Sequence, residues 1–434
     1  MVPRILLVNP PVYDFAAYDF WLKPYGLLSV AGYLRDKADF KLFDYLDRLH
    51  PFVAGQQNLQ SDKWGRGRFS CRHIPNPPSL QTIPRYFRRF GLPRNIFEDF
   101  LATKGPFDFA LIQTTMTYWY LGVTEVINDI RKACPKAKIV LGGNYVTLCT
   151  NHAEKLRPDY MVPGTNLEPL WTYLGIAPHL EQPALWEAYD KLNVGVLRLT
   201  DGCPFNCTYC SVPSTYGKFK PRPLQRSLAE LELLMTCGAE NIAFYDDALL
   251  FEAESVLVPF LNEVMKRDIN VSFHTPNGLN ARFVTKELAE LMMRTGFKTF
   301  YLGFESASLQ WQKDTGSKVF CDELTQAVHH LLSARAEPAS ITAYQILGHP
   351  YSDTGDLEAS MRFVNSLSIR GMLADFSPIP GTLDGDYCRK WVNMDEPLFH
   401  NKTAFPIILL GFNQTNRLKD LQRKLNRALP TKSL

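Results

Sequence analysis

The 434-residue sequence lacks any apolar run of the length that a membrane-spanning helix needs. Such a helix takes about 20 apolar residues, and the most apolar late run, FPIILLGF, is far shorter. A secretory signal is not expected either, because the apolar run RILLV ends at once in NPP. With nine cysteines, an odd number, a reducing cytoplasm is the expected compartment.

A strong net charge is also lacking. The formal charge of +3 is too small to imply binding to nucleic acid or to a membrane by itself. Hydrophobic residues make up 46% of the chain and charged residues 21%, which is ordinary for a globular protein. The length allows two or three domains, each with its own core, and no nucleic-acid partner is expected.

The one dense cysteine cluster lacks a fourth ligand. Cys203, Cys207 and Cys210 lie within eight residues, and the nearest other cysteine is Cys237. A structural zinc site takes four ligands, whereas three thiolates suit an iron-sulfur cluster whose fourth iron stays open to a substrate or cofactor. A chance cluster in a loop, a zinc site completed from elsewhere and a disulfide remain as alternatives.

The first third of the chain alternates strand-like and helix-like runs. RILLVN, FKLFDYL, DFALIQT and KIVLGG are apolar runs that suit buried parallel strands, and helical spacing lies between them. This pattern predicts an open, doubly wound α/β sheet of the Rossmann-like kind.

In such sheets ligands lie outside the carboxyl ends of the strands, which directs attention to QTTMTYW, GGNYVT and PGTNLE. The glycine pair in the second segment allows close approach to a ligand, and equally suits a tight turn. The residues expected to contact a ligand here are Thr114, Thr115, Met116, Gly142, Gly143, Val146, Gly164 and Glu168.

An insert at about residues 48–104 interrupts the alternation. From Lys63 to Arg94 it carries eight Lys or Arg and no Asp or Glu. One interpretation is a patch for an anionic group, such as a phosphate on a cofactor or substrate. The other is a solvated basic face.

From residue 194 the alternation starts again, with six strand-like runs: VLRLT, NIAFYDD, NVSFHT, TFYLGFES, SITAYQILG and ADFSPIPG. Six successive βα units predict a (β/α)6 partial TIM barrel, in which chemistry takes place at the carboxyl ends of the strands. The polar residues expected at those ends are Asp201, Asp246, Asp247, His274, Asn277, Glu305, Gln345 and His349.

The spacing C-x3-C-x2-C directly after the first strand of such a barrel, with Tyr209 before the last cysteine, resembles a radical S-adenosylmethionine (SAM) enzyme. FYDDALLF, TPNGLN, GFES, QILGHPYSD and FSPIPGT resemble, in that order, later segments of this superfamily. The resemblance implies that Cys203, Cys207 and Cys210 bind a [4Fe-4S] cluster. Its open iron would bind the amino and carboxylate groups of SAM.

The same resemblance implies further SAM contacts. Tyr245 and Asp246 fall where the family contacts the methionine amino group, and Asn277 and Glu305 where the ribose and methionine ends are held. Ile346 to Gly348 fall where the adenine stacks. One departure is the amino-binding segment, which is often Gly-Gly-Glu in the family and is FYDD here, so the contacts it makes stay open.

In the N-terminal half, RILLVNPP, MTYW, VLGGNYVTLCTNHA and DYMVPG resemble the cobalamin-binding domain that precedes the barrel in one class of radical SAM enzymes. The Asp-x-His-x-x-Gly signature is absent, so no cobalt ligand is named. We expect a cobalamin-binding-like domain over 1–185, a radical SAM barrel over 186–390 and a tail over 391–434.

These resemblances imply a cobalamin-dependent radical SAM enzyme that methylates an unactivated carbon through a 5′-deoxyadenosyl radical. Its substrate would be a small molecule, lipid or peptide, and its electron donor a protein such as flavodoxin or ferredoxin. No catalytic residue is assigned. The alternatives are a radical cyclisation, rearrangement or oxidation without catalytic cobalamin, and a non-catalytic binding or adaptor protein. A methylthio-transferase is disfavoured because the N-terminal half has no second clustered cysteine set.

The tail NRLKDLQRKLNRALPTKSL places leucines, among them Leu418, Leu421 and Leu425, on one helical face, with Lys and Arg around the rest. Such a helix can lie on a membrane surface or bind an anionic partner. It can also dock on its own barrel, which is the interpretation we favour.

Overall fold

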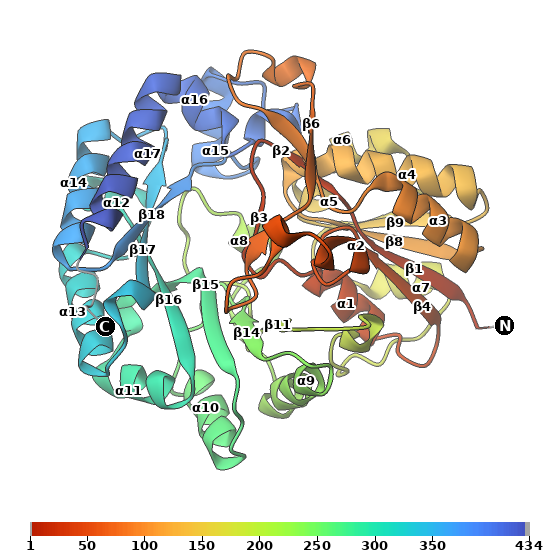
Figure 1. The fold of residues 1–434 in the computed structure, drawn as a ribbon, viewed down its shortest axis with the longest axis horizontal. Coiled ribbons are helices and arrows are strands. Elements are labelled where there is room, and N and C mark those ends of the chain that lie inside the picture. The colour runs from red at the N-terminus through yellow and green to blue at the C-terminus, as the bar shows by residue number, and fades with distance from the viewer. Residues whose placement is uncertain (1, 430–434) are drawn as a thin grey trace. The chain divides into compact units, whose positions relative to one another are not determined.

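In the computed structural model, which describes residues 2–429, the chain divides into two compact units (Figure 1). The first unit comprises residues up to 195 together with 229–239 and 393–401. The second comprises 196–228, 240–392 and the residues from 402. No helix among the described residues is both long and apolar enough to cross a membrane.

The first unit is built around a five-stranded parallel sheet in the order β10-β9-β8-β1-β4. Its strands are β1 (Arg4–Asn9), β4 (Asp39–Asp44), β8 (Phe109–Thr114), β9 (Lys138–Gly143) and β10 (Tyr160–Val162). Leu6 and Val8 of β1 pack in one core, and Ile5 and Leu7 pack in another. Because both faces of this strand are buried, its sequence is continuously apolar from Ile5 to Val8.

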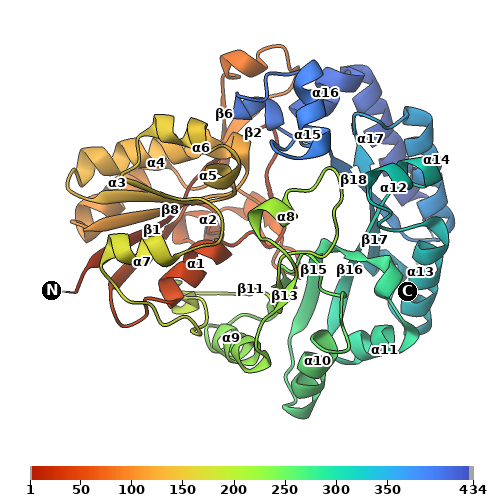
Figure 2. The ribbon, with the colours of Figure 1, turned by 180° about the vertical axis from the view of Figure 1, so that it is seen from behind.

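Helices cover both faces of this sheet (Figure 2). One core is covered by α2 (Pro51–Ala54), α3 (Arg94–Lys104), α4 (Tyr120–Ala133), α5 (Asn144–Leu148) and α6 (Thr150–Ala153). The other core is covered by α1 (Tyr25–Gly32) and α7 (Glu168–Leu174). The predicted doubly wound architecture is therefore confirmed.

The predicted insert is more regular than its sequence suggested. β2 (Val12–Asp14), β7 (Phe87–Phe90) and β6 (Cys71–Ile74) form an antiparallel sheet, and β3 (Tyr18–Asp19) pairs with β5 (Gly67–Arg68). Helix α3, also inside the predicted insert, packs on the main sheet through Phe97 and Leu101.

The basic stretch of this insert is partly neutralised by acidic residues of the same unit. Arg89, in the middle of β7, is buried and pairs with Glu125 of α4 at 2.6 Å. Arg66 pairs with Asp62, and Arg94 pairs with Asp129. A buried arginine inside FRRF breaks the apolar alternation, which is why the sequence pattern did not indicate strand β7.

The second unit contains a six-stranded sheet in the order β11-β14-β15-β16-β17-β18, with β11 and β18 at its edges. The strands are β11 (Val194–Leu197), β14 (Asn241–Phe244), β15 (Ser272–Asn280), β16 (Phe297–Glu305), β17 (Ile341–Leu347) and β18 (Arg370–Asp375). The pairs from β14 to β18 are parallel. The predicted (β/α)6 partial barrel is confirmed.

Helices follow the barrel strands in turn: α9 (Leu224–Thr236), α10 (Leu257–Lys266), α11 (Lys286–Arg294), α13 (Cys321–Ser333) and α14 (Thr354–Ser366). Figure 2 shows α8 (Val212–Thr215) on the inner side of the strands, opposite α11, α13 and α14. The cysteine segment directly precedes α8, so it also lies on this inner side.

Two predicted strand limits are wrong. Strand β15 continues through TPNGLN to Asn280, because an irregularity in its pairing between Thr275 and Leu279 accommodates the Pro-Asn-Gly sequence. Strand β18 ends at Asp375, before FSPIPGT. The two prolines of that segment have no N–H to donate to a sheet, so it forms a loop.

The tail forms α16 (Ala404–Leu410) and α17 (Phe412–Arg427). Leu418 is fully buried against Leu347 and Met361, and Leu421 and Leu425 pack beside it. The basic residues Arg423, Lys424 and Arg427 are exposed. Docking of the helix on its own barrel, the interpretation favoured from the sequence, is confirmed.

Candidate functional site

The three clustered cysteines lie on a loop that is closed at its base. Strands β12 (Thr200–Asp201) and β13 (Lys220–Pro221) pair before and after it. Gly202 has φ +69°, and a Cβ there would lie 2.4 Å from the carbonyl oxygen of Lys218. Gly316, after α12 (Leu309–Thr315), would place a Cβ 3.1 Å from the Cα of Cys207. Close backbone packing therefore holds the loop.

The thiols of Cys203, Cys207 and Cys210 are partly buried and close enough to influence one another electrostatically. Burial raises the pKa of all three, that of Cys210 to about 12, and the neighbouring thiols of the loop raise the pKa of Cys203 and Cys210 further. Backbone N–H groups of the loop and the Lys318 ammonium oppose this shift. All nine cysteines are free thiols.

The described residues contain no group of three or more Cys, His, Asp or Glu side chains arranged to hold one metal ion. An iron-sulfur cluster makes a different demand, because each cysteine binds a different iron and the sulfurs need not converge on one point. The chemistry of the three thiols and their N–H donors fits such a cluster.

Behind the loop lies a buried polar chain. The Thr208 hydroxyl donates to Asp384 Oδ2 at 2.6 Å, and Asp384 lies in α15 (Leu383–Tyr387). His349 contacts the same oxygen through Nε2 at 2.8 Å. Trp311 Nε1 donates to Nδ1 of His349 at 3.1 Å, so Nδ1 is an acceptor and Nε2 carries the hydrogen. His349, for which the sequence left open a place lining the site or a hydrogen-bonded role in a loop, supports the cysteine loop through these contacts.

A buried ion pair lies beside the thiols. Glu305, the last residue of β16, adopts φ +70° and accepts from Lys318 Nζ at 2.8 Å. A Cβ on Gly303 would lie 2.7 Å from that nitrogen, so the glycine leaves room for it. Burial alone would lower the pKa of Lys318, but Glu305 and Cys207 raise it above its usual value. Lys318 therefore carries a positive charge next to the cysteine loop.

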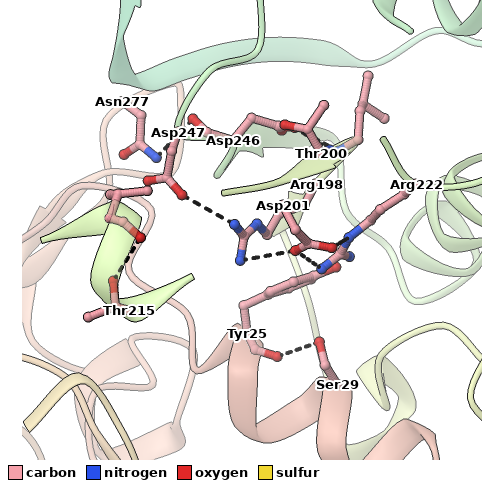
Figure 3. A network of polar contacts seen from close by, with 12 residues as sticks. Tyr25, Ser29, Arg198, Thr200, Asp201, Thr215, Arg222, Asp246, Asp247 and Asn277 are labelled. Carbon is pink, nitrogen blue, oxygen red and sulfur yellow. Dashed lines mark hydrogen bonds and ion pairs between the residues drawn. The ribbon is translucent and has the colours of Figure 1, made fainter. Parts of the chain in front are cut away.

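Asp246, directly after β14, is almost fully buried at 3% exposure (Figure 3). Its Oδ1 accepts from the Leu199 and Thr200 amides and from the Thr200 hydroxyl, at 2.9, 2.6 and 2.7 Å. Its Oδ2 has no hydrogen-bond partner among the described residues. Burial raises the pKa of this carboxyl group. The side chain thus keeps one acceptor oxygen available.

Asp247 belongs to a neighbouring network of charges (Figure 3). Its Oδ2 accepts from Arg198 at 3.3 Å, and Arg198 also approaches Asp201 at 3.6 Å. Arg222 donates twice to Asp201, at 2.9 and 2.8 Å. Burial raises the pKa of Asp247 to about 6, and Arg198 only partly opposes this. This network fixes β12 against the end of β14.

The barrel brings most of the expected SAM contacts into two groups. Asn277 Nδ2 donates to the Asp246 carbonyl oxygen at 3.2 Å. In the second group, the Tyr209 hydroxyl is hydrogen-bonded to Cys207. Burial raises the pKa of Tyr209, and the charges of Glu305 and Cys207 raise it further. Tyr344, which the sequence did not single out, lies near Glu305 and donates to the Pro276 carbonyl at 2.9 Å.

The remaining expected SAM contacts are less informative. Tyr245 follows β14 and is half-buried, and Ile346 in β17 is buried. Gly348 has φ +82°, and a Cβ there would lie 2.7 Å from Pro406, so packing alone requires this glycine. His274 is buried within β15 and bonds to Thr299 and Asn241. It does not lie at a strand end, where the sequence pattern put it.

The first unit has a pocket at the carboxyl ends of β1 and β8. From these two neighbouring strands the chain continues to opposite sides of the sheet, to β4 and to β9. Such switch points are where open α/β sheets bind ligands. Its lining residues are Asn9, Pro10, Pro11, Val12, Leu22, Lys23, Leu46, Gln113, Thr115, Met116, Trp119 and Val123. Two of the residues expected from the sequence, Thr115 and Met116, are among them.

The other residues expected at this edge lie outside the pocket lining. The Thr114 hydroxyl donates to the Gly142 carbonyl at 3.0 Å. Gly143 has φ +119°, and a Cβ there would lie only 2.1 Å from the carbonyl oxygen of Thr114. Val146 is fully buried in the core. Gly164 and Glu168 follow β10, with Glu168 starting α7. The tight turn thus accounts for Gly143 without a ligand.

The sequence of the barrel matches a known family. The model of the Radical SAM superfamily matches residues 197–364. This stretch includes the three loop cysteines and barrel strands β14 to β17. The chain contains a radical SAM domain.

Curated proteins resemble the chain beyond the radical SAM domain. The hopanoid C-2 methylase of Rhodopseudomonas palustris is 27% identical over 306 residues, which are 68% of this chain and 50% of the methylase. An uncharacterized methyltransferase of Pyrococcus horikoshii is 26% identical over 201 residues, 46% of this chain and 42% of that protein. The chain thus spans about half the length of these relatives.

Solved structures share the fold of both units. The radical SAM methyltransferase TsrM of Kitasatospora setae, with tryptophan and a SAM analogue bound, has a TM-score of 0.65 at 13% identity. The match covers 90% of this chain and 77% of TsrM. The cobalamin-dependent radical SAM enzyme OxsB, with aqua-cobalamin and SAM bound, has a TM-score of 0.58 at 14% identity, covering 98% of this chain and 61% of OxsB.

Two residues of the second unit that lie beside the cysteine loop, Lys318 and Asp384, were not indicated by the sequence. Lys318 follows a helix in TGSKVF and Asp384 lies in GTLDGDY, segments without a motif that indicates a site. The signal available in the sequence was only their polarity within apolar surroundings. Their partners Glu305 and Thr208 are 13 and 176 residues away, so the fold alone brings them together.

Proposed function

We propose that the chain is a cobalamin-dependent radical SAM enzyme that transfers a methyl group to an unactivated carbon. The observation that carries this proposal is that Cys203, Cys207 and Cys210 lie together on one closed loop inside a radical SAM domain. They would bind a [4Fe-4S] cluster. When bound, the cluster supplies the electron that cleaves SAM into methionine and a 5′-deoxyadenosyl radical, and cobalamin supplies the methyl group.

The residues around the loop suit SAM. The ammonium of its methionine part needs an acceptor, and Asp246 Oδ2 is buried without a partner among the described residues. Asn277 is bonded to the backbone of Asp246 and would hold the same region of the ligand. Lys318 would balance the negative charge that three thiolates bring to the cluster. Tyr209, Tyr245, Glu305, Ile346 and Gly348 stay proposed SAM contacts.

The first unit would hold cobalamin along the edge of its sheet that carries the small pocket beside Thr115 and Met116. Support comes from its doubly wound sheet, whose switch point is the expected ligand site, and from the fold likeness to OxsB, which is described with aqua-cobalamin bound. Thr114, Gly142, Gly143, Val146, Gly164 and Glu168 lie outside that pocket lining and stay proposed cobalamin contacts at the same edge of the sheet.

The substrate would be a small molecule, lipid or peptide, and a flavodoxin or ferredoxin would deliver the electron. TsrM, described with its substrate tryptophan, is a small-molecule example among proteins of this fold. Nine free thiols and an oxygen-labile cluster suit a reducing cytoplasm.

The test is cleavage of SAM by anaerobically reconstituted, reduced protein. We expect 5′-deoxyadenosine from the radical reaction, and S-adenosylhomocysteine when hydroxocobalamin is present, because methyl transfer from SAM leaves that product. The triple variant Cys203→Ala, Cys207→Ala, Cys210→Ala should form neither. Cleavage retained by this variant would contradict the proposal. Formation of 5′-deoxyadenosine with no cobalamin-dependent S-adenosylhomocysteine would favour a radical enzyme without catalytic cobalamin.

A further inference from the structure

Residues 393–401, which we call the return segment, follow the radical SAM domain in sequence but belong to the first unit. The chain on both sides of the segment, up to Val392 and from Lys402, belongs to the second unit. The segment contains a short helix, η9 (Pro397–His400). It packs against another, η3 (Thr117–Trp119), which directly follows the predicted ligand-binding end of β8.

His400 makes the central contact of the return segment. It is fully buried, and its Nδ1 lies 2.9 Å from the Thr117 hydroxyl. Its Nε2 lies 3.0 Å from the carbonyl oxygen of Met394. A carbonyl oxygen only accepts, so Nε2 carries the hydrogen and Nδ1 accepts from Thr117. One ring nitrogen therefore holds the segment's own turn, and the other holds the loop after β8.

Asn401 makes a second link through Asp14. Its Nδ2 donates to Asp14 Oδ1 at 2.8 Å, while Trp119 Nε1 donates to Asp14 Oδ2 at 2.9 Å. Asp14 and Asn401 are both buried, at 0% and 1% exposure. The two oxygens of one carboxylate thus join the return segment to Trp119, a residue of the pocket lining.

Glu396 makes a third link, to the start of α4. It accepts from the Tyr120 hydroxyl at 3.2 Å and from the Leu398 amide at 3.0 Å. The Tyr120 ring stacks on Tyr145 of α5, with ring centroids 6.0 Å apart. The same segment therefore supports the chain after β8 and the chain after β9.

These contacts converge on residues 115–120, which we call the pocket loop because Thr115, Met116 and Trp119 line the pocket of the first unit. We propose that Glu396, His400 and Asn401 are positioning residues that hold the pocket loop in the form that binds cobalamin. The inference rests on the proposed function for the identity of the ligand. The contacts themselves concern the shape of the pocket alone.

Two substitutions of His400 separate the link to the loop from the folding of the segment. An Asn side chain reaches the position of Nδ1, so His400→Asn keeps a partner for Thr117 and loses the bond to Met394. A Gln side chain reaches the position of Nε2, so His400→Gln keeps the bond to Met394 and loses the link to the loop. Both variants keep an amide of similar polarity in the same buried place.

The measurement is titration of the full-length apoprotein with hydroxocobalamin, followed by its visible spectrum. Loss of one buried hydrogen bond corresponds to about fivefold weaker binding. We expect about that loss for His400→Gln and affinity within about twofold of the unsubstituted protein for His400→Asn. Hydrogen exchange of residues 115–120 should rise in the Gln variant only, whether or not cobalamin is present.

Equal affinities and equal exchange for both variants would overturn the inference, as would a larger loss for the Asn variant. If the unsubstituted protein binds no cobalamin, the proposed cofactor fails, and with it the ligand part of the inference. Hydrogen exchange still decides the other part in that case. A pocket loop equally protected in both variants would show that His400 does not position it.

Discussion

Nε2 of His349 donates to Asp384 Oδ2 at 2.8 Å beneath the cysteine loop, and both side chains are buried. The same oxygen accepts from Thr208, which lies between two of the cysteines. A single carboxylate therefore ties the loop to α15 and to the end of β17. We regard this contact as the support that keeps the cysteines in place before a cluster is assembled.

Removing this support should weaken cluster retention. Asp384→Ala leaves the buried hydroxyl and imidazole without their acceptor, which typically costs about 1–3 kcal/mol for each unsatisfied group. We expect a lower free energy of unfolding and a faster loss of iron to a chelator after reconstitution. The control is Asp386→Asn. Asp386 is an exposed residue of the same helix, and the Asn side chain still offers an oxygen that accepts from the Gly381 amide. Unchanged iron retention in Asp384→Ala would disprove the supporting role.

The pair of Lys318 and Glu305 predicts a non-additive effect on stability. Lys318→Met leaves a buried carboxylate beside the thiols without its partner, and breaking such a pair costs about 3–5 kcal/mol. Adding Glu305→Gln removes the unpaired charge, so the double variant should recover much of the loss. Urea unfolding of the apoprotein measures all three variants. Losses that simply add would show that the two side chains do not interact.

Asp44 predicts a specific dependence of stability on pH. Burial raises its pKa to about 6, although Lys23, the Tyr189 hydroxyl and the Leu46 amide favour the charged form. In the unfolded chain the pKa is about 3.9. The folded state therefore binds the proton more tightly, and this stabilisation is full below about pH 4 and is lost as the pH rises through about 6.

The variant Asp44→Asn should remove this dependence, because its amide does not titrate and can still donate to the Tyr189 oxygen. Between pH 4 and pH 7 the free energy of unfolding of the unsubstituted protein should fall by about 2–3 kcal/mol relative to the variant. Chemical denaturation at several pH values measures the difference. Parallel stability curves would mean that Asp44 titrates alike in the folded and unfolded states.

Docking of α17 predicts opposite responses from its two faces. Leu418 is fully buried in a cluster with Leu347 and Met361, so Leu418→Ala should cost about 2–5 kcal/mol. Arg427 is exposed, so Arg427→Ala should change stability by less than about 0.5 kcal/mol. Thermal unfolding of the two variants compares them. A stable Leu418→Ala variant would contradict the packing of the tail on the barrel.

Repeating βα patterns made both sheets predictable. The run ILLV within RILLVN is apolar throughout because Ile5 and Leu6 pack in different cores, and this feature can be read directly from the sequence. The cysteine loop could also be read from the sequence, because its three cysteines are near neighbours in the chain. Strand β7 was missed because Arg89 is buried by pairing with Glu125, and an arginine in the sequence indicates exposure unless its partner is known.

The supports of the site could not be predicted from local patterns. Asp384 meets Thr208 across 176 residues, and His400 meets Thr117 across 283. Nothing in PLFHN distinguishes a segment that belongs to the first unit from a loop of the barrel. Such contacts depend on the path of the chain after β18, and no local pattern in the sequence indicates that path.

The most direct test of the account is to count metals. Protein purified without oxygen is reconstituted with iron, sulfide and hydroxocobalamin, desalted, and analysed for iron and cobalt per chain. We predict about four irons and about one cobalt, with the iron lost in the triple cysteine variant and the cobalt retained there. A preparation that binds iron no better than the cysteine variant would contradict the central claim that these three thiols hold a [4Fe-4S] cluster.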